Sequence, residues 1–163
     1  DCSNNKLKQL SLGASRLKFL NCSNNMITSL PNTYSRLTCL DCSNTKITAI
    51  PDTFTNLNCL DCSGCNINDN KTLKRVLVMD LEESTSYNYS YQLHTKHKTG
   101  IPSSLVNLTT LNCRGNPFVY IPNTLVHLDT IFYNDNQNVY IPDTLRAIPI
   151  VCSNDTTDVV CSF

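Results

Sequence analysis

The stretch LTCLDCSNTKITAIPDTFTNLNCLDCSGCNI, from Leu37 to Ile67, nearly repeats itself after twenty residues. The motif LxCLDCS begins at Leu37 and again at Leu57, and each copy carries cysteines in the same places. The period aligns columns of residues: Leu17, Leu37 and Leu57; Leu20, Leu40 and Leu60; Cys22, Cys42 and Cys62; Ile27, Ile47 and Ile67. Similarity at a short fixed period indicates a repeat architecture, in which stacked units share one core.

Weaker copies extend over nearly the whole chain. They contain Cys2, Asn5 and Leu7; Val76, Met79 and Leu81; Leu108, Leu111, Cys113, Asn116 and Phe118; Leu128, Ile131, Tyr133 and Asn136; and a decayed copy from Ile148. The back half recurs as SLPNTYSRL at 29–37, AIPDTFTNL at 49–57, YIPNTLVHL at 120–128 and YIPDTLRAI at 140–148. We expect one domain over 1–163 with about seven to eight coils, an irregular insert at 85–100 and a C-terminal cap at about 149–163.

The pattern LxxLxCxxNxI resembles the leucine-rich repeat (LRR) family, and its length and IPxTLxxL back half resemble short repeats of giant DNA viruses and bacterial effectors. The resemblance implies an α/β fold: a right-handed solenoid with a parallel β-sheet on the concave face and short 3₁₀ or extended segments on the convex face. The residues agree, because alternating Leu40 and Cys42 predict a strand with one buried face. A strand that returns once per coil pairs in parallel with its predecessor, about 4.8 Å away.

The regular cysteines Cys2, Cys22, Cys42, Cys62 and Cys113 stand where the family has an inward Leu or Val. Free cysteine behaves as a small hydrophobe, so we predict a buried column of reduced thiols. Cys62 and Cys65 have the C-x₂-C spacing of a zinc site, but the repeat directs both into one core, and we expect no metal or cofactor. Regular repeat cysteines favour a reducing, intracellular (cytoplasmic) location, or a virion for a viral protein. Cys152 and Cys161 remain a candidate disulfide in the cap.

A second regular column is polar. It contains Asn5, Asn25, Asn116 and Asn136, and it is interrupted by Thr45, Cys65 and Ser84. We predict that these amides satisfy backbone groups where the coil turns, because buried backbone groups require partners.

Two outward rows flank the inward Leu of each strand, and they are the candidate site for a protein partner. One contains Asp1, Asn21, Asp41, Asp61, Asp80, Asn112 and Phe132; the other contains Phe19, Cys39, Cys59, Val78, Thr110 and Thr130. We expect Asp41, Asp61 and Asp80 to be neighbours that dock a basic or amide-rich partner, with a merely solvated polar face as the alternative. Cys39 and Cys59 are predicted to be exposed thiols that can pair on oxidation.

Between Ser84 and Ile101 the chain has about twelve residues more than neighbouring copies. Tyr87, Tyr89 and Tyr91 alternate there, which predicts an extended arm with aromatic rings on one side. Loops on rigid scaffolds commonly carry function, and tyrosine is favoured at interfaces. We therefore expect this insert to contribute to partner binding, with a plain surface loop as the alternative.

Charge and composition exclude other classes. The 13 basic and 13 acidic residues and the pI of about 6.9 argue against nucleic-acid binding. The sequence has no membrane-length apolar run and no GxSxG, HExxH or glycine-rich phosphate motif, so we expect neither membrane insertion nor enzyme activity. The leading prediction is a protein-interaction module. Two alternatives are a structural component of a viral particle or scaffold, and the substrate-recognition region of a larger effector such as a ubiquitin ligase. The bare first coil also suggests that more protein, or a neighbouring subunit, covers the Asp1 end.

Overall fold

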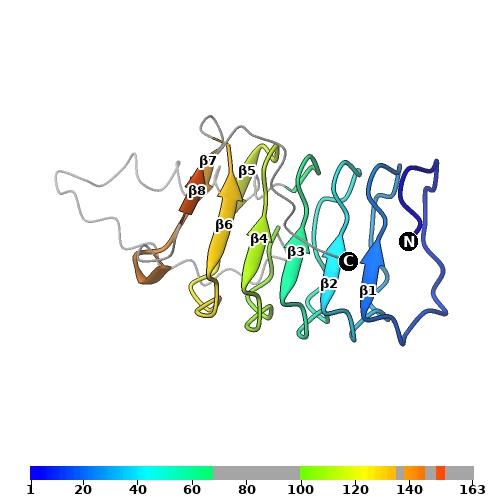
Figure 1. The fold of residues 1–163 in the computed structure, drawn as a ribbon, viewed down its shortest axis with the longest axis horizontal. Coiled ribbons are helices and arrows are strands. Elements are labelled where there is room, and N and C mark those ends of the chain that lie inside the picture. The colour runs from blue at the N-terminus through cyan, green and yellow to red at the C-terminus, as the bar shows by residue number, and fades with distance from the viewer. Residues whose placement is uncertain (68–99, 135–137, 146–149, 153–163) are drawn as a thin grey trace, which may run out of the picture.

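The computed structural model describes residues 1–67, 100–134, 138–145 and 150–152, which wind into a solenoid of stacked coils. Each successive coil contributes one strand to a six-stranded parallel sheet, whose order is β1-β2-β3-β4-β6-β8. Its strands are β1 (Phe19–Asn21), β2 (Cys39–Asp41), β3 (Cys59–Asp61), β4 (Thr110–Asn112), β6 (Thr130–Tyr133) and β8 (Ile150–Cys152). They lie side by side along the solenoid axis (Figure 1).

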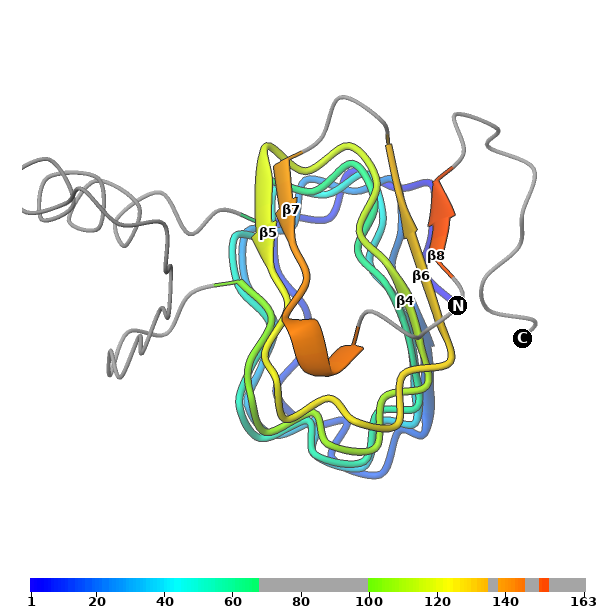
Figure 2. The same cartoon turned by 90° about the vertical axis from the view of Figure 1, so that its left-hand side faces the viewer.

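A second, smaller sheet lies on the opposite wall of the coils (Figure 2). There β5 (Phe118–Tyr120) pairs in parallel with β7 (Asn138–Tyr140). The only helical segment among the described residues is the 3₁₀ helix η1 (Asp143–Leu145). The predicted parallel solenoid is therefore observed, but the α/β class is not confirmed, since the described coils return through turns and extended segments.

The sheet register shows where the repeat is interrupted. Paired residues of consecutive strands are 20 positions apart, as in Cys39 and Cys59, whereas Cys59 and Thr110 are 51 apart, 31 more than one coil. The strands β3 and β4 are direct neighbours in the sheet. The degenerate copy through Val76, Met79 and Leu81 lies outside the described residues and stays a prediction.

The solenoid resumes at Gly100, which lies beside Ala49 in the neighbouring coil. Ala49 and Gly100 form an isolated parallel bridge, and the Ile50 N–H donates to the Gly100 carbonyl at 3.2 Å. The inserted segment therefore leaves after Ile67 and returns at Gly100. Residues 68–99, which include the predicted Tyr87, Tyr89 and Tyr91 arm, lie outside the described residues.

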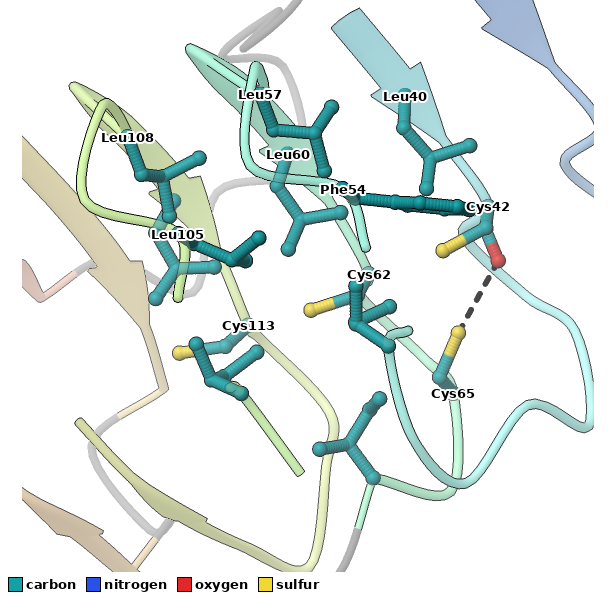
Figure 3. Packing of buried hydrophobic residues seen from close by; sticks show 14 of the residues in the cluster. Leu40, Cys42, Phe54, Leu57, Leu60, Cys62, Cys65, Leu105, Leu108 and Cys113 are labelled. Atoms are coloured by element: carbon teal, nitrogen blue, oxygen red, sulfur yellow. Dashed lines mark hydrogen bonds between the residues drawn. The ribbon is translucent and has the colours of Figure 1, made fainter. Parts of the chain in front are cut away.

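The core consists of the columns predicted from the repeat. Leu40, Leu60 and Leu111 at the strand centres are fully buried, and Phe54 fills the interior between coils (Figure 3). Further buried columns are Ile27, Ile47 and Ile67; Leu37, Leu57, Leu108 and Leu128; and Ile50, Ile101 and Ile121. Each coil buries its apolar edge against its neighbours, and hydrophobic burial of this kind is the main stabilising contribution.

The IPxT segments form tight turns and tie one coil to the next. In one coil the Tyr34 N–H donates to the Pro31 carbonyl at 3.3 Å, which closes a single turn, and the pattern recurs after every described proline of this motif. The threonine of the motif binds the preceding coil: Thr53 Oγ1 donates to the Asn32 carbonyl at 2.9 Å and Thr124 Oγ1 to the Ser103 carbonyl at 2.7 Å. The single-turn segments expected on the back of the coil are therefore present.

The asparagine column behaves as predicted. Asn25 Nδ2 donates to the Cys2 and Cys22 carbonyls at 2.9 and 3.0 Å, while its Oδ1 accepts from the Leu7 N–H at 2.9 Å. Asn116 makes the equivalent bonds further along the stack. Where the column is interrupted, the Thr45 hydroxyl donates to the Cys42 carbonyl at 2.7 Å instead. Asn136 and Ser84 lie outside the described residues.

Candidate partner-binding face

The first and third residues of each main-sheet strand point away from the core, and together they form what we call the outer sheet face. Its members are Phe19, Asn21, Cys39, Asp41, Cys59, Asp61, Thr110, Asn112, Thr130 and Phe132. Alternation along a strand places them there, opposite the buried central Leu or Ile. Exposure varies strongly within the face: Phe19 is 56% exposed, whereas Asn112 is only 5% exposed. Asn112 was predicted to be an outward partner-binding residue, and its burial limits that role.

The acidic row has a structural function that the sequence did not reveal. Asp41 Oδ1 accepts hydrogen bonds from the backbone N–H and the hydroxyl of Ser43, at 3.0 and 2.7 Å. Asp61 and Ser63 repeat this arrangement at 2.9 and 2.7 Å, as does the pair Asn21 and Ser23. Such side-chain bonds to the backbone two residues later close a turn. One oxygen of each carboxylate is therefore occupied by its own coil.

Asp61 differs from Asp41 because it also touches the next coil. Its Oδ2 accepts from Asn112 Nδ2 at 3.0 Å, and Asn112 is its register partner on β4. Asp80 lies outside the described residues, so the predicted grouping of three aspartates stays a prediction. Burial raises the pKa of Asp61 and Asp41 adds to the rise, while the hydrogen bonds from Ser63 and Asn112 lower it.

The two outward cysteines have different states. Cys39 is a free, partly buried thiol whose pKa is raised by burial. Cys59, directly beside it on β3, is buried and disulfide-bonded, so neither cysteine is the exposed thiol that was predicted. The expected pairing of Cys39 with Cys59 is therefore wrong, because a sulfur forms one disulfide and Cys39 is free. The candidate disulfide of Cys152 with Cys161 concerns side chains outside the described part of the chain.

Arg114 was missed by the sequence reasoning. Its guanidinium carbon lies 5.0 Å from the ring centroid of Phe132, which is a cation–π distance. The available signal was its position two residues after Asn112, where earlier coils carry Ser23, Ser43 and Ser63. The outer sheet face therefore changes along the stack, from carboxylates on β2 and β3 to a cation over an aromatic ring at β4 and β6.

Four of the five predicted inward cysteines form a column of buried thiols, whereas the fifth, Cys2 in the first coil, is only half-buried. The four are Cys22, Cys42, Cys62 and Cys113. The backbone N–H of each donates to the next coil, and the thiols of Cys42, Cys62 and Cys113 do so as well. The Cys42 N–H and thiol, for example, reach the Asp61 carbonyl at 2.9 and 3.4 Å. Burial raises the pKa of Cys22 and of Cys113 to about 12, so these thiols stay protonated. Protonated buried thiols are neither nucleophiles nor metal ligands.

Cys65 is the exceptional thiol of the core. Its Sγ donates to the Cys42 carbonyl at 3.1 Å (Figure 3). The same Sγ lies 3.3 Å from Thr45 Oγ1. A hydrogen bond with the Cys42 thiol lowers the pKa of Cys65 to about 7 and contributes most to raising that of Cys42. Within the described ranges, no group of three or more His, Cys, Asp or Glu side chains is arranged to hold a metal ion.

Comparison with known families agrees with this geometry. A family model described as "Leucine Rich repeats (2 copies)" matches residues 15–52, and a second, "Leucine Rich Repeat", matches residues 107–128. These matches and the structural neighbours support a leucine-rich repeat protein. Leucine-rich repeat proteins are generally non-enzymatic modules that bind other proteins. No curated protein matches the chain.

Two solved structures of bacterial proteins, with TM-scores above 0.5, share the fold. The internalin InlF of Listeria monocytogenes superposes with a TM-score of 0.57 at 17% identity, covering 90% of this chain and 38% of its own. The Leptospira interrogans LRR protein LIC12759 gives 0.51 at 20% identity, covering 94% and 42%. The functional domain of Listeria InlJ, described as including a cysteine ladder, gives 0.49 at 26% identity, covering 82% and 29%. This LRR chain thus spans less than half of each of these proteins.

Two predictions about context remain untested. The resemblance to viral repeats finds no support among these matches, so a virion location stays a prediction, as does a cytoplasmic one. Within the described residues, no helix has the length and apolar character needed to cross a membrane.

Proposed function

We propose that this LRR protein binds a protein partner through the outer sheet face at β1–β3, with the segment 68–99 adding specificity. The observation that supports this most directly is Phe19, a large aromatic side chain that is more than half exposed beside Asn21 and Cys39. Exposed apolar groups rimmed by polar ones mark interaction surfaces, and buried aromatic residues anchor interfaces.

The adjacent Asp41 suits a basic or amide-rich partner. Its Oδ1 accepts two hydrogen bonds from Ser43. Its Oδ2 has no hydrogen-bond partner among the described residues and can accept a hydrogen bond from a binding partner. Because the carboxylate is fixed by its own turn, little side-chain freedom is lost on binding, and this favours affinity. The sheet backbone beneath it is likewise hydrogen-bonded on both sides of β2.

The inserted segment is attached far from this surface. It leaves after Ile67 and returns at Gly100, whose column continues to Tyr120 and Tyr140 in the small sheet on the opposite wall. A partner that uses both regions must therefore reach around the solenoid. This separation allows each region to be tested by its own variant.

The test of the outer sheet face is the substitution Phe19→Asp. Val126→Asp is the matched control, because Val126 is also strongly exposed but lies outside the outer sheet face. With each protein immobilised, the wild type and Val126→Asp should retain the same partner from an extract, identified by mass spectrometry, and Phe19→Asp should lose it. Equal capture by all three proteins would refute the proposed face.

The test of the insert is a deletion designed from the register. Removing residues 69–99 joins Ile67–Asn68 to Gly100, which reproduces the spacing of Ile47, Thr48 and Ala49. We expect the deletion variant to keep its cooperative melting transition. We also expect it to lose its partner or to bind a wider range of proteins. Unaltered binding would restrict the site to the outer sheet face, and unfolding would show that the segment is part of the core.

A further inference from the structure

One step of the solenoid carries a cysteine on both sides of the gap between coils. Each regular inward cysteine is followed, one coil later, by a residue of the asparagine column. These pairs are Cys2 with Asn25, Cys22 with Thr45, Cys42 with Cys65 and Cys62 with Asn116. Among the described coils, only the step from the coil of β2 to the coil of β3 therefore places two thiols opposite each other. The C-x₂-C spacing of Cys62 and Cys65 results from this replacement of asparagine by cysteine.

The two thiols meet because they are directed in opposite directions along the stack. The Cys42 thiol is directed forward and reaches the Asp61 carbonyl of the next coil at 3.4 Å. The Cys65 thiol is directed backward and donates to the Cys42 carbonyl at 3.1 Å (Figure 3). The two side chains also share a hydrogen bond. Both cysteines are free, so each sulfur is available for a new bond.

Neighbouring cysteines do not compete for Cys65. Cys62 precedes it by only three residues, but the Cys62 thiol is directed forward to the Asn112 carbonyl at 3.3 Å, away from the coil of β2. The coils of β2 and β3 also stay paired beyond their strands, since the Cys42 N–H donates to the Asp61 carbonyl at 2.9 Å. Paired segments lie about 4.8 Å apart, a separation that a disulfide can span.

We propose that Cys42 and Cys65 form a reversible disulfide that ties the coil of β2 to the coil of β3 when the protein meets a peroxide. The Cys65 thiolate attacks one peroxide oxygen to give a sulfenic acid, and the released hydroxide takes up the proton that Cys65 had lost. The Cys42 thiol then attacks the sulfenic sulfur, and the hydroxyl leaves with the thiol proton as water. Two thiols thus lose two electrons, and one peroxide is reduced to two waters.

Cys65 is suited to react first. A hydrogen bond from the Cys42 thiol lowers the pKa of Cys65 to about 7, and the thiolate is the nucleophilic form of cysteine. Burial instead raises the pKa of Cys22 and Cys113 to about 12. Because Cys65 is only 6% exposed, the reaction requires a small neutral oxidant such as hydrogen peroxide. Cys42 is fully buried and stays a structural thiol until Cys65 has been oxidised.

The test is disulfide mapping of the complete protein after treatment with hydrogen peroxide. The protein is unfolded, alkylated and cleaved before aspartate, so that Cys42 lies in fragment 41–51 and Cys65 lies with Cys62 in fragment 61–68. We expect the two fragments to be joined with Cys62 alkylated, and a dithiol reductant to release them. An alkylated Cys42, a Cys65 oxidised only to sulfinic or sulfonic acid, or a bond from Cys65 to any other cysteine would overturn the inference.

Two variants make the assignment specific. Cys65→Thr introduces the residue that the preceding coil carries at position 45, so it should fold, and after peroxide its Cys42 should be fully alkylated. Cys39→Ser removes a free thiol from the outer sheet face and should keep the linkage. A Cys42 that is still cross-linked in Cys65→Thr, or a linkage lost in Cys39→Ser, would show that a different pair reacts.

Thermal melting tests whether the linkage holds the coils together. A disulfide restricts the unfolded chain, so peroxide should raise the melting temperature of the wild type by about 5 °C or more. The same treatment should leave the melting temperature of Cys65→Thr unchanged. This comparison is independent of the proposed partner-binding face, since no partner is present. Cross-linked protein that melts no higher than untreated protein would refute the role in tying the two coils.

Discussion

Cys39 and Cys42 are three residues apart in and just after the same strand, yet they lie in different environments. Cys42 points inward, is fully buried and donates its thiol to the next coil, whereas Cys39 points outward and is only partly buried. The same contrast separates Cys62 from Cys59, of which only Cys59 is disulfide-bonded. The side of the sheet, rather than the residue type, therefore decides whether a cysteine here is structural or chemically available.

The largest effect is expected for the inward polar column, at Asn116→Ala. This change leaves the Ile67 N–H and the Cys62 and Cys113 carbonyls without their side-chain partner. Buried unsatisfied groups cost about 1–3 kcal/mol each, so the free energy of unfolding should fall by about 3 kcal/mol in urea titration. Asn5→Ala is the matched control in the exposed first coil and should cost under about 1 kcal/mol. Equal losses would show that burial does not control this column.

The direct test of the comparison is serine substitution at two cysteines. Cys42→Ser should lower the free energy of unfolding by about 1–3 kcal/mol, because a hydroxyl is more costly to bury than a thiol. Cys42→Ala should cost less, since it leaves only a small cavity. Cys39→Ser, on the outward side, should change stability by less than about 0.5 kcal/mol. Similar losses at Cys39 and Cys42 would contradict the distinction between the two sides.

A smaller effect is expected where neighbouring turns are in close contact. Gly115 has φ of 67°, and a Cβ there would lie 3.2 Å from the backbone nitrogen of Gly64. Gly115→Ala should therefore lower the free energy of unfolding by about 1–2 kcal/mol, because alanine is strained in the left-handed conformation and its Cβ would press on the Gly64 backbone. Gly13→Ala is the control, since its Cβ meets nothing closer than 3.8 Å. If both variants melted alike, the turns would not be packed this closely.

The smallest effect is expected for Asp61 on the outer sheet face, and it is a dependence of stability on pH. Burial raises the folded-state pKa of Asp61, so the folded state holds a proton over a pH range in which the unfolded state has lost it. Asp61 therefore contributes stability at low pH that is lost as pH rises through the folded-state pKa. The melting temperature of the wild type relative to Asp61→Asn should be higher near pH 4 than at pH 7. If the melting temperature of the wild type relative to Asp61→Asn were instead higher at pH 7 than near pH 4, the pKa of Asp61 would be lowered by folding and not raised.

Much of the fold was predictable because one pattern recurs. The Leu, Ile and Cys columns and the Asn column each occupy the same environment in successive coils, so their burial followed from the period alone. The pairing of β3 with β4 across 51 positions was not predictable, because it depends on where the chain rejoins the stack after the insert. Of the candidate site, the outward direction of Asp41 and Cys39 was predictable, but the burial of Asn112 was not, because it depends on contacts between coils.

The sequence by itself determined the repeat, its inward columns and the coil-to-coil spacing, since burial of an apolar column needs only periodicity. The tertiary structure alone decided which segments are neighbours: β3 pairs with β4 across 51 residues, and Asp61 therefore contacts Asn112. It also decided that Cys39 is free while Cys59 is bonded. Such pairings depend on distances between segments remote in the chain, and these are fixed only when the coils stack.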